Sequence, residues 1–280
     1  MRLIDTTLFW NEFDILELRL ATHYDHVDKF VIVECDRTYS GDYKGFRLEP
    51  HLDRYSKWMD KIDYIKVENS PTHANPWDNE HWQRDNMKLG WSDVTPEDVI
   101  HISDLDEIVR PEAFEFMRTT DYSFYGLYMP AFYFKFNYVD TKPDWHYKVW
   151  GRAYRGFQVA PHKMRYMGSH EVPGKTINLH HAGWHFGWLG DETFAKTKIK
   201  SFSHNEINKP EILDNIDIEK HISEGRDHFR PENVTWHKVD LDSYFPKTIL
   251  ENKEKYSQFI LPDSGKTVRD FWTAEILQPV

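Results

Sequence analysis

The segment VIHISDLDEI (residues 99–108) constrains the fold of this chain more than any other. It begins with an apolar, β-branched run, which is typical of a buried strand. Three carboxylates follow, on Asp104, Asp106 and Glu107, where that strand would emerge. In an open α/β sheet, ligands bind at the carboxyl ends of the strands. The segment therefore predicts a ligand site at the end of a buried strand.

The spacing of the two aspartates suits a metal ion. On an extended backbone, Asp104 and Asp106 would point the same way, with Leu105 turned back into the core. Two such carboxylates can share Mg²⁺ or Mn²⁺, and such a cation usually holds substrate phosphates. The alternative is an acidic strand end or a helix cap, because Asp-x-Asp is common in solvated loops. The preceding apolar run favours a metal-bound nucleotide.

A second candidate segment is HHAGWHFGW (residues 180–188), which has three histidines within six residues. Imidazole is a good ligand for Mn²⁺-like metals, so His185 is the candidate that completes the aspartate site. Trp184 is the candidate for contact with a sugar or a base, which aromatic faces suit. His180 and His181 are interpreted as packed or hydrogen-bonded core residues.

Two basic positions could serve a phosphate. Arg84 lies on a predicted helix before the aspartate strand, where it would clamp a phosphate or hold a strand-end carboxylate. Lys198, with lysines two residues away on either side, would neutralise a leaving diphosphate. The alternative for Lys198 is a solvated helix face, and for Arg84 a structural role is equally compatible with the sequence.

Strand and helix signals alternate over residues 1–120. Hydrophobic periodicity and turn residues give the order strand, helix, strand, strand, helix, strand, helix. This order favours a mostly parallel sheet flanked by helices. The expected helices cover residues 12–22, 80–89 and 111–117, and the expected strands include residues 29–34 and 61–67.

The second half of the chain differs in character. Residues 123–138 are dense in aromatic side chains and read as strand, as do residues 176–181. Residues 212–223 and 246–259 are predicted to be helical. No internal repeat or linker separates the halves, so we expect one α/β domain over residues 1–280, with a mixed, aromatic-rich second half.

The charge distribution bears on the partners. A net charge of −11 argues against a general polyanion-binding protein. Residues 142–175, however, carry seven Lys or Arg side chains against two acidic ones, a local balance of +5. That stretch would suit a diphosphate or an acidic acceptor, and a solvated basic face is the alternative.

The single cysteine, Cys35, excludes an internal disulfide and suits a reducing compartment. No secretory signal or membrane span is visible in the sequence. We therefore expect a cytoplasmic protein, of a bacterial cell or of the host cell of a virus.

Several segments, in this order, resemble glycosyltransferase family 17, the family of the β-1,4-mannosyl-glycoprotein 4-β-N-acetylglucosaminyltransferase. FWNEFDILELR (residues 9–19) is similar to the family's N-E-x-D-x-L-x-x-R-L opening, and QRD (83–85) and SDLDEI (103–108) to its Q-R-D and D-x-D-E-I-P motifs. The other similar segments are residues 27–34, 38–41, 182–186, 200–206, 225–227 and 246–256.

The resemblance implies a GT-A-like fold with a nucleotide-binding half (residues 1–120) and an acceptor half with C-terminal helices (residues 121–280). It implies a UDP-sugar donor, N-acetylglucosamine being one candidate sugar, and a divalent cation (Mn²⁺ or Mg²⁺) on the diphosphate. The acceptor would be a glycan or another hydroxyl compound. An inverting mechanism needs a general base, for which Glu107, Asp191 and Glu192 are unranked candidates.

Three rival functions remain open from the sequence alone. The same carboxylates would serve a metal-dependent phosphohydrolase or nucleotidyltransferase. The aromatic residues would suit a non-catalytic module that binds a sugar or nucleotide. A glycosyltransferase that acts on modified DNA bases is compatible with residues 142–175 but not favoured by the net charge of −11. The chain has no P-loop, G-x-S-x-G or G-x-G-x-x-G motif.

Overall fold

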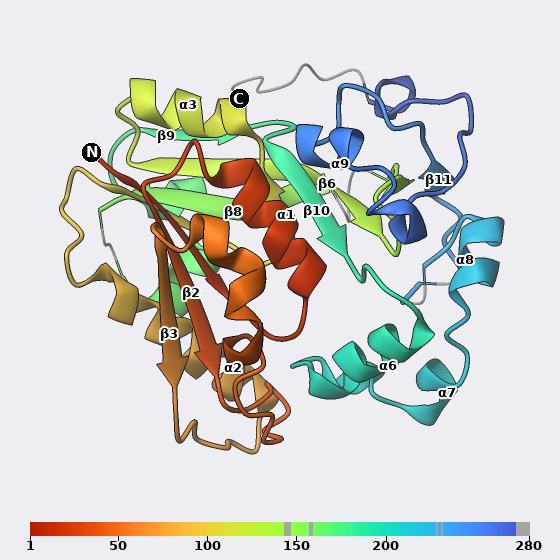
Figure 1. Cartoon of the computed structure of the whole chain (residues 1–280), viewed down its shortest axis with the longest axis horizontal. Coiled ribbons are helices and arrows are strands. Elements are labelled where there is room, and N and C mark those ends of the chain that lie inside the picture. Colours follow the sequence, from red (N-terminus) through yellow and green to blue (C-terminus); the bar gives the residue numbers. More distant parts are fainter. Residues whose placement is uncertain (143–146, 157–158, 228, 231, 273–280) are drawn as a thin grey trace.

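The computed structural model describes residues 1–142, 147–156, 159–227, 229–230 and 232–272. Its strands form one mixed sheet (Figure 1). The strands are β1 (Leu3–Leu8), β2 (Lys29–Cys35), β3 (Ile62–Val67), β4 (Val99–Ile102), β5 (Glu107–Val109), β6 (Phe124–Tyr133), β7 (Tyr138–Asp140), β8 (Tyr147–Arg155), β9 (Thr176–Leu179), β10 (Gly183–Gly187) and β11 (Trp236–Lys238).

Helices and short 3₁₀ segments connect these strands. The α-helices are α1 (Phe13–His23), α2 (Pro76–Asp85), α3 (Pro111–Thr119), α5 (Pro161–Tyr166), α6 (Glu192–Ser201), α7 (Pro210–Leu213), α8 (Ile218–Glu224) and α9 (Lys247–Glu251). The 3₁₀ segments are η1 (Glu49–Trp58), η2 (Asn86–Trp91), η3 (Ser169–Glu171), η4 (Asn205–Ile207), η5 (Ser257–Phe259) and η6 (Val268–Asp270).

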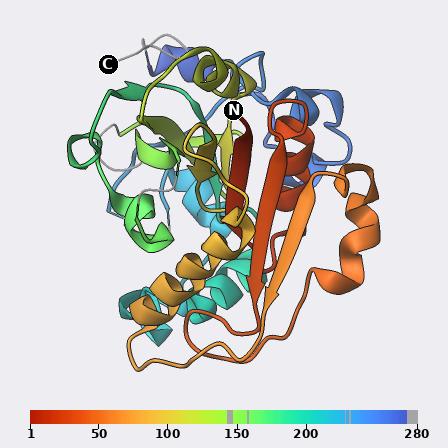
Figure 2. The ribbon, with the colours of Figure 1, turned by 90° about the vertical axis from the view of Figure 1, so that its left-hand side faces the viewer.

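The first four strands form the parallel part of the sheet, in the order β3-β2-β1-β4. In Figure 2 the strands β1, β2 and β3 lie side by side, with α1 and η1 on one side of them and α2 on the other. Side chains from α1, η1 and α3 pack in one core cluster, whereas η2 and α5 contribute to a second. Burial on both faces explains why β2 and β4 are almost continuously apolar.

The expectation of a mostly parallel sheet is wrong, because β8 pairs antiparallel with both β4 and β6. The strand β6 also pairs antiparallel with β7 but parallel with β9 and β10. A short connection from β6 to β7 permits only antiparallel pairing, since parallel neighbours need a longer crossover. The α/β class and the mixed second half are confirmed.

Two helices expected in the second half are shorter than the periodicity predicts. The first is divided into α7 and α8, because the Asp217 side chain accepts a hydrogen bond from the N–H of Lys220 and begins a new helix. The second is reduced to α9 and η5. In the described part of the chain, no helix has the length and apolar character needed to cross a bilayer.

Candidate active site

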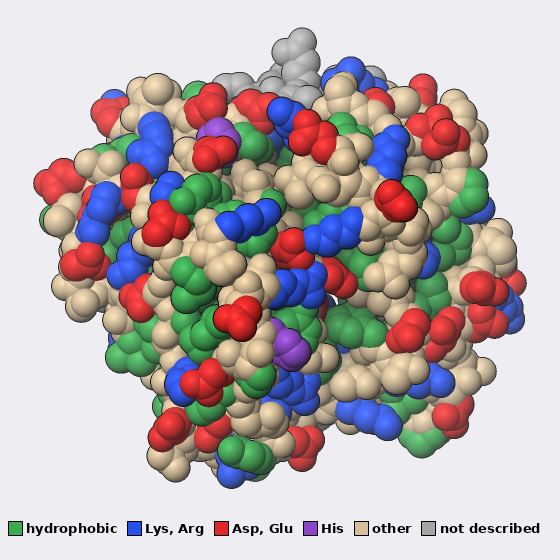
Figure 3. Space-filling model, in the orientation of Figure 1, with side chains coloured by type: hydrophobic (Ala, Val, Ile, Leu, Met, Phe, Trp, Pro, Cys, Tyr) green, Lys and Arg blue, Asp and Glu red, His purple; other side chains and the backbone are tan. Residues whose placement is uncertain are grey.

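A cavity of ≈ 600 Å³ opens at the carboxyl ends of β1, β2 and β4. Its lining includes Phe9 just after β1, Thr38 after β2 and Asp104 after β4. Figure 3 shows acidic and basic side chains around the hollow on this face, between α1 and α6. Ligand pockets usually have volumes of about 300–1,000 Å³, so the cavity has the size of a small-molecule site.

The two aspartates lie on a turn, so the extended backbone expected between them is wrong. The N–H of Glu107 donates to the carbonyl oxygen of Asp104 at 3.1 Å, which closes the turn. Leu105 packs in the core, as expected, and is 3% exposed. Because the chain turns between Asp104 and Asp106, their carboxylates contact different partners.

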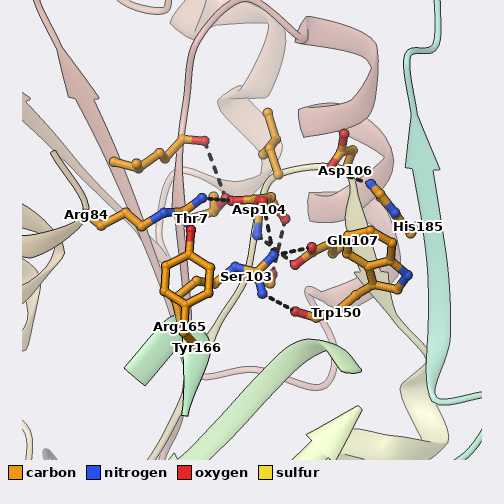
Figure 4. A network of polar contacts seen from close by, with 12 residues as sticks. Thr7, Arg84, Ser103, Asp104, Asp106, Glu107, Trp150, Arg165, Tyr166 and His185 are labelled. Atoms are coloured by element: carbon orange, nitrogen blue, oxygen red, sulfur yellow. Dashed lines mark hydrogen bonds and ion pairs between the residues drawn. The ribbon is translucent and has the colours of Figure 1, made fainter. Parts of the chain in front are cut away.

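Asp104 lies between two buried arginines (Figure 4). Its Oδ1 is 2.6 Å from Nη2 of Arg84 on α2, and its Oδ2 is 3.1 Å from Nη2 of Arg165 on α5. Partial burial alone would raise the pKa of Asp104, but the two guanidinium groups hold it well below its usual range. Both oxygens of this carboxylate are thus held by cationic side chains.

The same arginines have unused donors. Nη1 of Arg84 and Nε of Arg165 are buried and have no hydrogen-bond partner among the described residues. A buried donor that lacks an acceptor costs roughly 1–3 kcal/mol, and more when the group is charged. An anionic ligand beside these arginines would remove that cost.

Asp106 contacts side chains from the second half of the chain. Its Oδ1 is 3.6 Å from Nε2 of His185 on β10, and its Oδ2 is 3.1 Å from Nζ of Lys198 on α6. Lys198 also binds Oε1 of Glu12 at 2.7 Å. Burial alone would lower the pKa of Lys198, but Glu12 and Asp106 raise it above its usual value. Two carboxylates therefore share one ammonium group on this side of the turn.

The pairing of β5 with β10 brings His185 to the turn. The strands are antiparallel with Glu107 opposite His185, and the N–H of Phe186 donates to the carbonyl oxygen of Asp106 at 2.8 Å. Side chains alternate along a strand, so Trp184 faces away from His185 into the core. Trp184 is 1% exposed, lies under the Arg110 guanidinium and does not line the cavity.

Arg19, which the sequence reasoning did not single out, supports the turn from α1. Its guanidinium donates to the carbonyl oxygens of Asp104 and Glu107, at 2.8 and 3.2 Å. It also forms a buried ion pair of 2.5 Å with Asp5 on β1. Arg19 falls three residues after Leu16 on the apolar face of the predicted helix, and a charge there indicates a buried partner.

Glu107 is fully buried and does not line the cavity. Its Oε1 accepts from Nη2 of Arg165 at 2.5 Å, and its Oε2 accepts from the N–H of Asp104 at 2.9 Å. Burial raises the pKa of Glu107 to about 8, against the opposing charge of Arg165. These contacts make Glu107 a support for the turn, and its role as a base stays a prediction.

Asp191 and Glu192 lie at the start of α6. Asp191 Oδ1 accepts from the N–H of Phe194 at 2.8 Å, which caps the helix, and Glu192 Oε1 accepts from the N–H of Ile218 at 3.1 Å. Both residues line a second cavity rather than the first. Their expected role as a base also stays a prediction.

The expected metal ligands are only partly brought together. Asp106 and His185 converge, whereas Asp104 contacts two arginines. Among the described residues, no group of three or more His, Cys, Asp or Glu side chains is arranged to hold a metal ion. His180 and His181 each contact a tyrosine hydroxyl, in agreement with their interpretation as hydrogen-bonded residues.

Other site residues were missed because nothing local distinguishes them. Arg165 is one of seven basic residues in the segment of residues 142–175, and nothing in the sequence sets it apart from the other six. Within that segment, residues 143–146 and 157–158 lie outside the described residues. Glu12 lies in the segment that resembles the family's opening motif, but the sequence reasoning assigned it only to the start of a helix. Trp150 and Trp188 line the cavity, whereas Trp184 does not. Which tryptophan faces the cavity depends on the side of the backbone from which its side chain projects, and the sequence alone does not reveal that side.

Comparison with known proteins gives one family. The model of glycosyltransferase family 17 matches residues 1–270 of the 280-residue chain. None of the curated proteins matches. The match spans the cavity, the turn and every segment of the resemblance, and it sets aside the phosphohydrolase and non-catalytic alternatives. The chain therefore belongs to glycosyltransferase family 17 and is a glycosyltransferase.

Proposed function

We propose that the chain is a metal-dependent, inverting glycosyltransferase that transfers a sugar from a UDP-sugar to a hydroxyl group of a glycan. N-acetylglucosamine is the first candidate sugar, because of the family that the sequence resembles. The observation that carries the proposal is one turn with arginines on one side and an excess of carboxylates on the other. A metal-bound diphosphate has the complementary charges.

The arginine side supports a diphosphate site. Arg84 and Arg165 line the cavity and offer the buried donors Nη1 and Nε. Guanidinium groups bind phosphate oxygens through charge-assisted hydrogen bonds, which are stronger than neutral ones. Lys148 and Lys198 line the same cavity and add positive charge.

The carboxylate side supports the metal. Asp106 and His185 would hold Mn²⁺ or Mg²⁺, because carboxylate oxygen and imidazole nitrogen both suit Mn²⁺ and the two donor atoms are 3.6 Å apart. Diphosphate oxygens and water usually supply the remaining ligands of such an ion. When bound, the ion would stabilise the negative charge of the departing diphosphate. Asp104 is left out of this ligand pair because both of its oxygens contact arginines.

The fold supports a GT-A-like arrangement within a single domain. The parallel strands β1, β2 and β4 end at the cavity, as expected of a nucleotide-binding half over residues 1–120. Residues 121–280 would then form the acceptor half. Ten aromatic side chains line the cavity, Trp10, Trp150 and Trp188 among them, and they offer platforms for the base and the sugar.

In the proposed reaction, the acceptor oxygen forms a bond to the anomeric carbon while the bond from that carbon to the diphosphate breaks. Arg84, Arg165 and Lys198 stabilise the negative charge that the diphosphate gains. Because the attack comes from the opposite face, the configuration at the anomeric carbon inverts. A general base must take the proton of the acceptor hydroxyl.

We also propose that the chain works in the reducing cytoplasm. Its Cys35 is a free, buried thiol. Burial raises the pKa of Cys35 to about 12, so the thiol is unreactive.

The test combines binding with product analysis. Thermal shifts are measured with UDP and a panel of UDP-sugars, with Mn²⁺ and with EDTA, and a specific Mn²⁺-dependent shift is expected. The enzyme is then incubated with each UDP-sugar and a set of p-nitrophenyl glycosides, and UDP release with a glycosylated product is expected. Release of UMP without glycoside product would contradict the proposal.

A further inference from the structure

Glu12 is a carboxylate whose position the fold of α1 does not explain. It precedes α1, yet its side chain forms no capping hydrogen bond with that helix. Its Oε1 contacts Lys198, and no other polar contact of this carboxylate occurs within the described residues. The side chain is 11% exposed, so Oε2 remains available to a ligand.

Glu12 lines two cavities. The first is the cavity at the Asp104–Asp106 turn, and the second, of ≈ 800 Å³, lies beside it. The helix α6 forms part of both walls, with Lys198 in the first cavity and Phe194 in the second. The rings of Trp10 in the first cavity and Phe194 in the second have centroids 5.9 Å apart. The two cavities therefore meet at Glu12.

The second cavity has the chemistry of a saccharide site. Its lining has five carboxylates, those of Glu12, Asp14, Asp191, Glu192 and Glu219, against three cationic side chains. Carboxylates accept hydrogen bonds from sugar hydroxyls, and the lining also has three phenylalanine rings for the apolar sugar face. The acidic excess opposes a polyanion such as DNA.

We propose that the second cavity is the acceptor subsite for a neutral saccharide and that Glu12 is the general base for its attacking hydroxyl. This inference rests on the proposed glycosyl transfer and locates the acceptor and the base within it. Neither Glu107, buried behind the turn, nor the helix-capping Asp191 lies between the cavities.

The step balances at Glu12. The acceptor O–H proton passes to Oε2, the acceptor oxygen bonds to the anomeric carbon, and the electron pair of the broken carbon–oxygen bond leaves with the diphosphate. Burial raises the pKa of Glu12, with the charge of Lys198 opposing, which suits a group that must hold a proton during transfer. Lys198 connects Glu12 to Asp106 and so positions the base beside the donor site.

The first test is E12Q in the full chain, with p-nitrophenyl glycosides as acceptors and the UDP-sugar that the wild type uses. Loss of the base is expected to lower kcat by roughly 10²–10⁴-fold. The UDP-dependent thermal shift and the KM for the donor should stay within about twofold of wild type, because Glu12 does not contact the diphosphate in this proposal. E112Q, at an exposed glutamate of α3 outside both cavities, is the matched control and should keep full activity.

The second test is S223W, a substitution at an exposed position on α8 whose larger side chain should narrow the second cavity without disturbing the core. It should raise the KM for the acceptor at least about tenfold and leave donor binding unchanged. Circular dichroism and thermal melting of both variants verify folding.

The outcomes separate this inference from the proposed function. If the wild type transfers no sugar from any UDP-sugar, the proposed function fails. If the wild type is active, then E12Q with more than a third of its kcat, or with weakened UDP binding, overturns the assignment of Glu12. An unchanged acceptor KM in S223W, or salt-sensitive transfer to DNA rather than to glycosides, overturns the acceptor subsite.

Discussion

The two aspartates of the turn have the same chemistry and opposite surroundings. Asp104 meets guanidinium groups from α2 and α5, and these retain buried donors for an anion. Asp106 meets an imidazole and an ammonium group from β10 and α6, and Glu12 shares that ammonium. One side of the turn is thus suited to an anion and the other to a cation. The packing partners therefore distinguish the two carboxylates, which the Asp-x-Asp spacing does not.

The largest expected effect is that of D106A. Removing this carboxylate should lower kcat/KM on the order of 10³-fold and abolish the Mn²⁺-dependent part of the UDP thermal shift, because the proposed metal ligand and the partner of Lys198 are lost. Steady-state kinetics and thermal shifts measure both. D53A, at an exposed aspartate of η1, is the control. Unchanged turnover in D106A would remove the metal assignment.

R84M tests the opposite side of the turn. Loss of a charge-assisted hydrogen bond of about 1.5–3 kcal/mol should weaken UDP binding roughly 10- to 100-fold. The loss should be the same with Mn²⁺ and with EDTA, whereas the effect of D106A on UDP affinity should disappear in EDTA. Isothermal titration of UDP under both conditions decides. If the loss of UDP affinity depended on Mn²⁺ in both R84M and D106A, the two sides of the turn would form a single binding site rather than two separate ones.

E107Q separates support from catalysis. It weakens a buried contact with Arg165, which keeps its bonds to Asp104 and to the carbonyl oxygen of Trp150. We expect the free energy of unfolding to fall by about 2–3 kcal/mol, measured by urea denaturation, and activity of the folded variant to fall less than tenfold. A stable variant with a 10³-fold loss of kcat would instead make Glu107 the base.

The smallest expected effect is a pH dependence of the free energy of unfolding. It should not distinguish the two sides of the Asp104–Asp106 turn, because its source, His23, lies in the core behind that turn. His23 donates from Nδ1 to Asp5 and accepts at Nε2 from the N–H of Val109. Burial lowers the pKa of His23 from 6.5 to about 4. Between these values the unfolded chain binds the proton more readily, so the free energy of unfolding decreases as pH falls from 6.5 to 4 and is unaffected by this group above 6.5.

Thermal melting from pH 7.5 to 4.5 measures this dependence. It should be shallower in H23Q than in wild type. An equal slope in the two proteins would exclude His23 as its source.

Local patterns sufficed where a residue's role depends on its own strand or helix. The periodicity around Leu16 predicts α1, and the apolar run before Asp104 predicts β4 and the site at its end. The proximity of Asp106 and His185 was expected from the chemistry of their side chains, since imidazole and carboxylate can share one metal ion. The division of the chain into two functional halves remains a prediction.

Where the sequence reasoning failed, the deciding contacts join distant segments. Trp184 was the aromatic candidate for the site, but it is buried in the core, and nothing in the sequence reveals which face of β10 meets the core. Because the chain turns at Leu105, Asp104 contacts Arg165, which lies on α5, far from Asp104 in the sequence. Likewise, the antiparallel β8 inserts between β4 and β6 from a later part of the chain, which an ordered list of elements does not reveal.

The pairing of β5 with β10 determines when the site is completed during synthesis of the chain. During synthesis the parallel strands β1–β4 emerge first, but His185 and Lys198 leave the ribosome only after most of the chain has been made. Contacts over such sequence separations form late, because the intervening loop must first be closed. A nascent chain of about 120 residues would possess the arginine Arg84 and both aspartates without the partners of Asp106. If the proposed metal-dependent nucleotide binding occurs as described, it would therefore appear only in the finished chain.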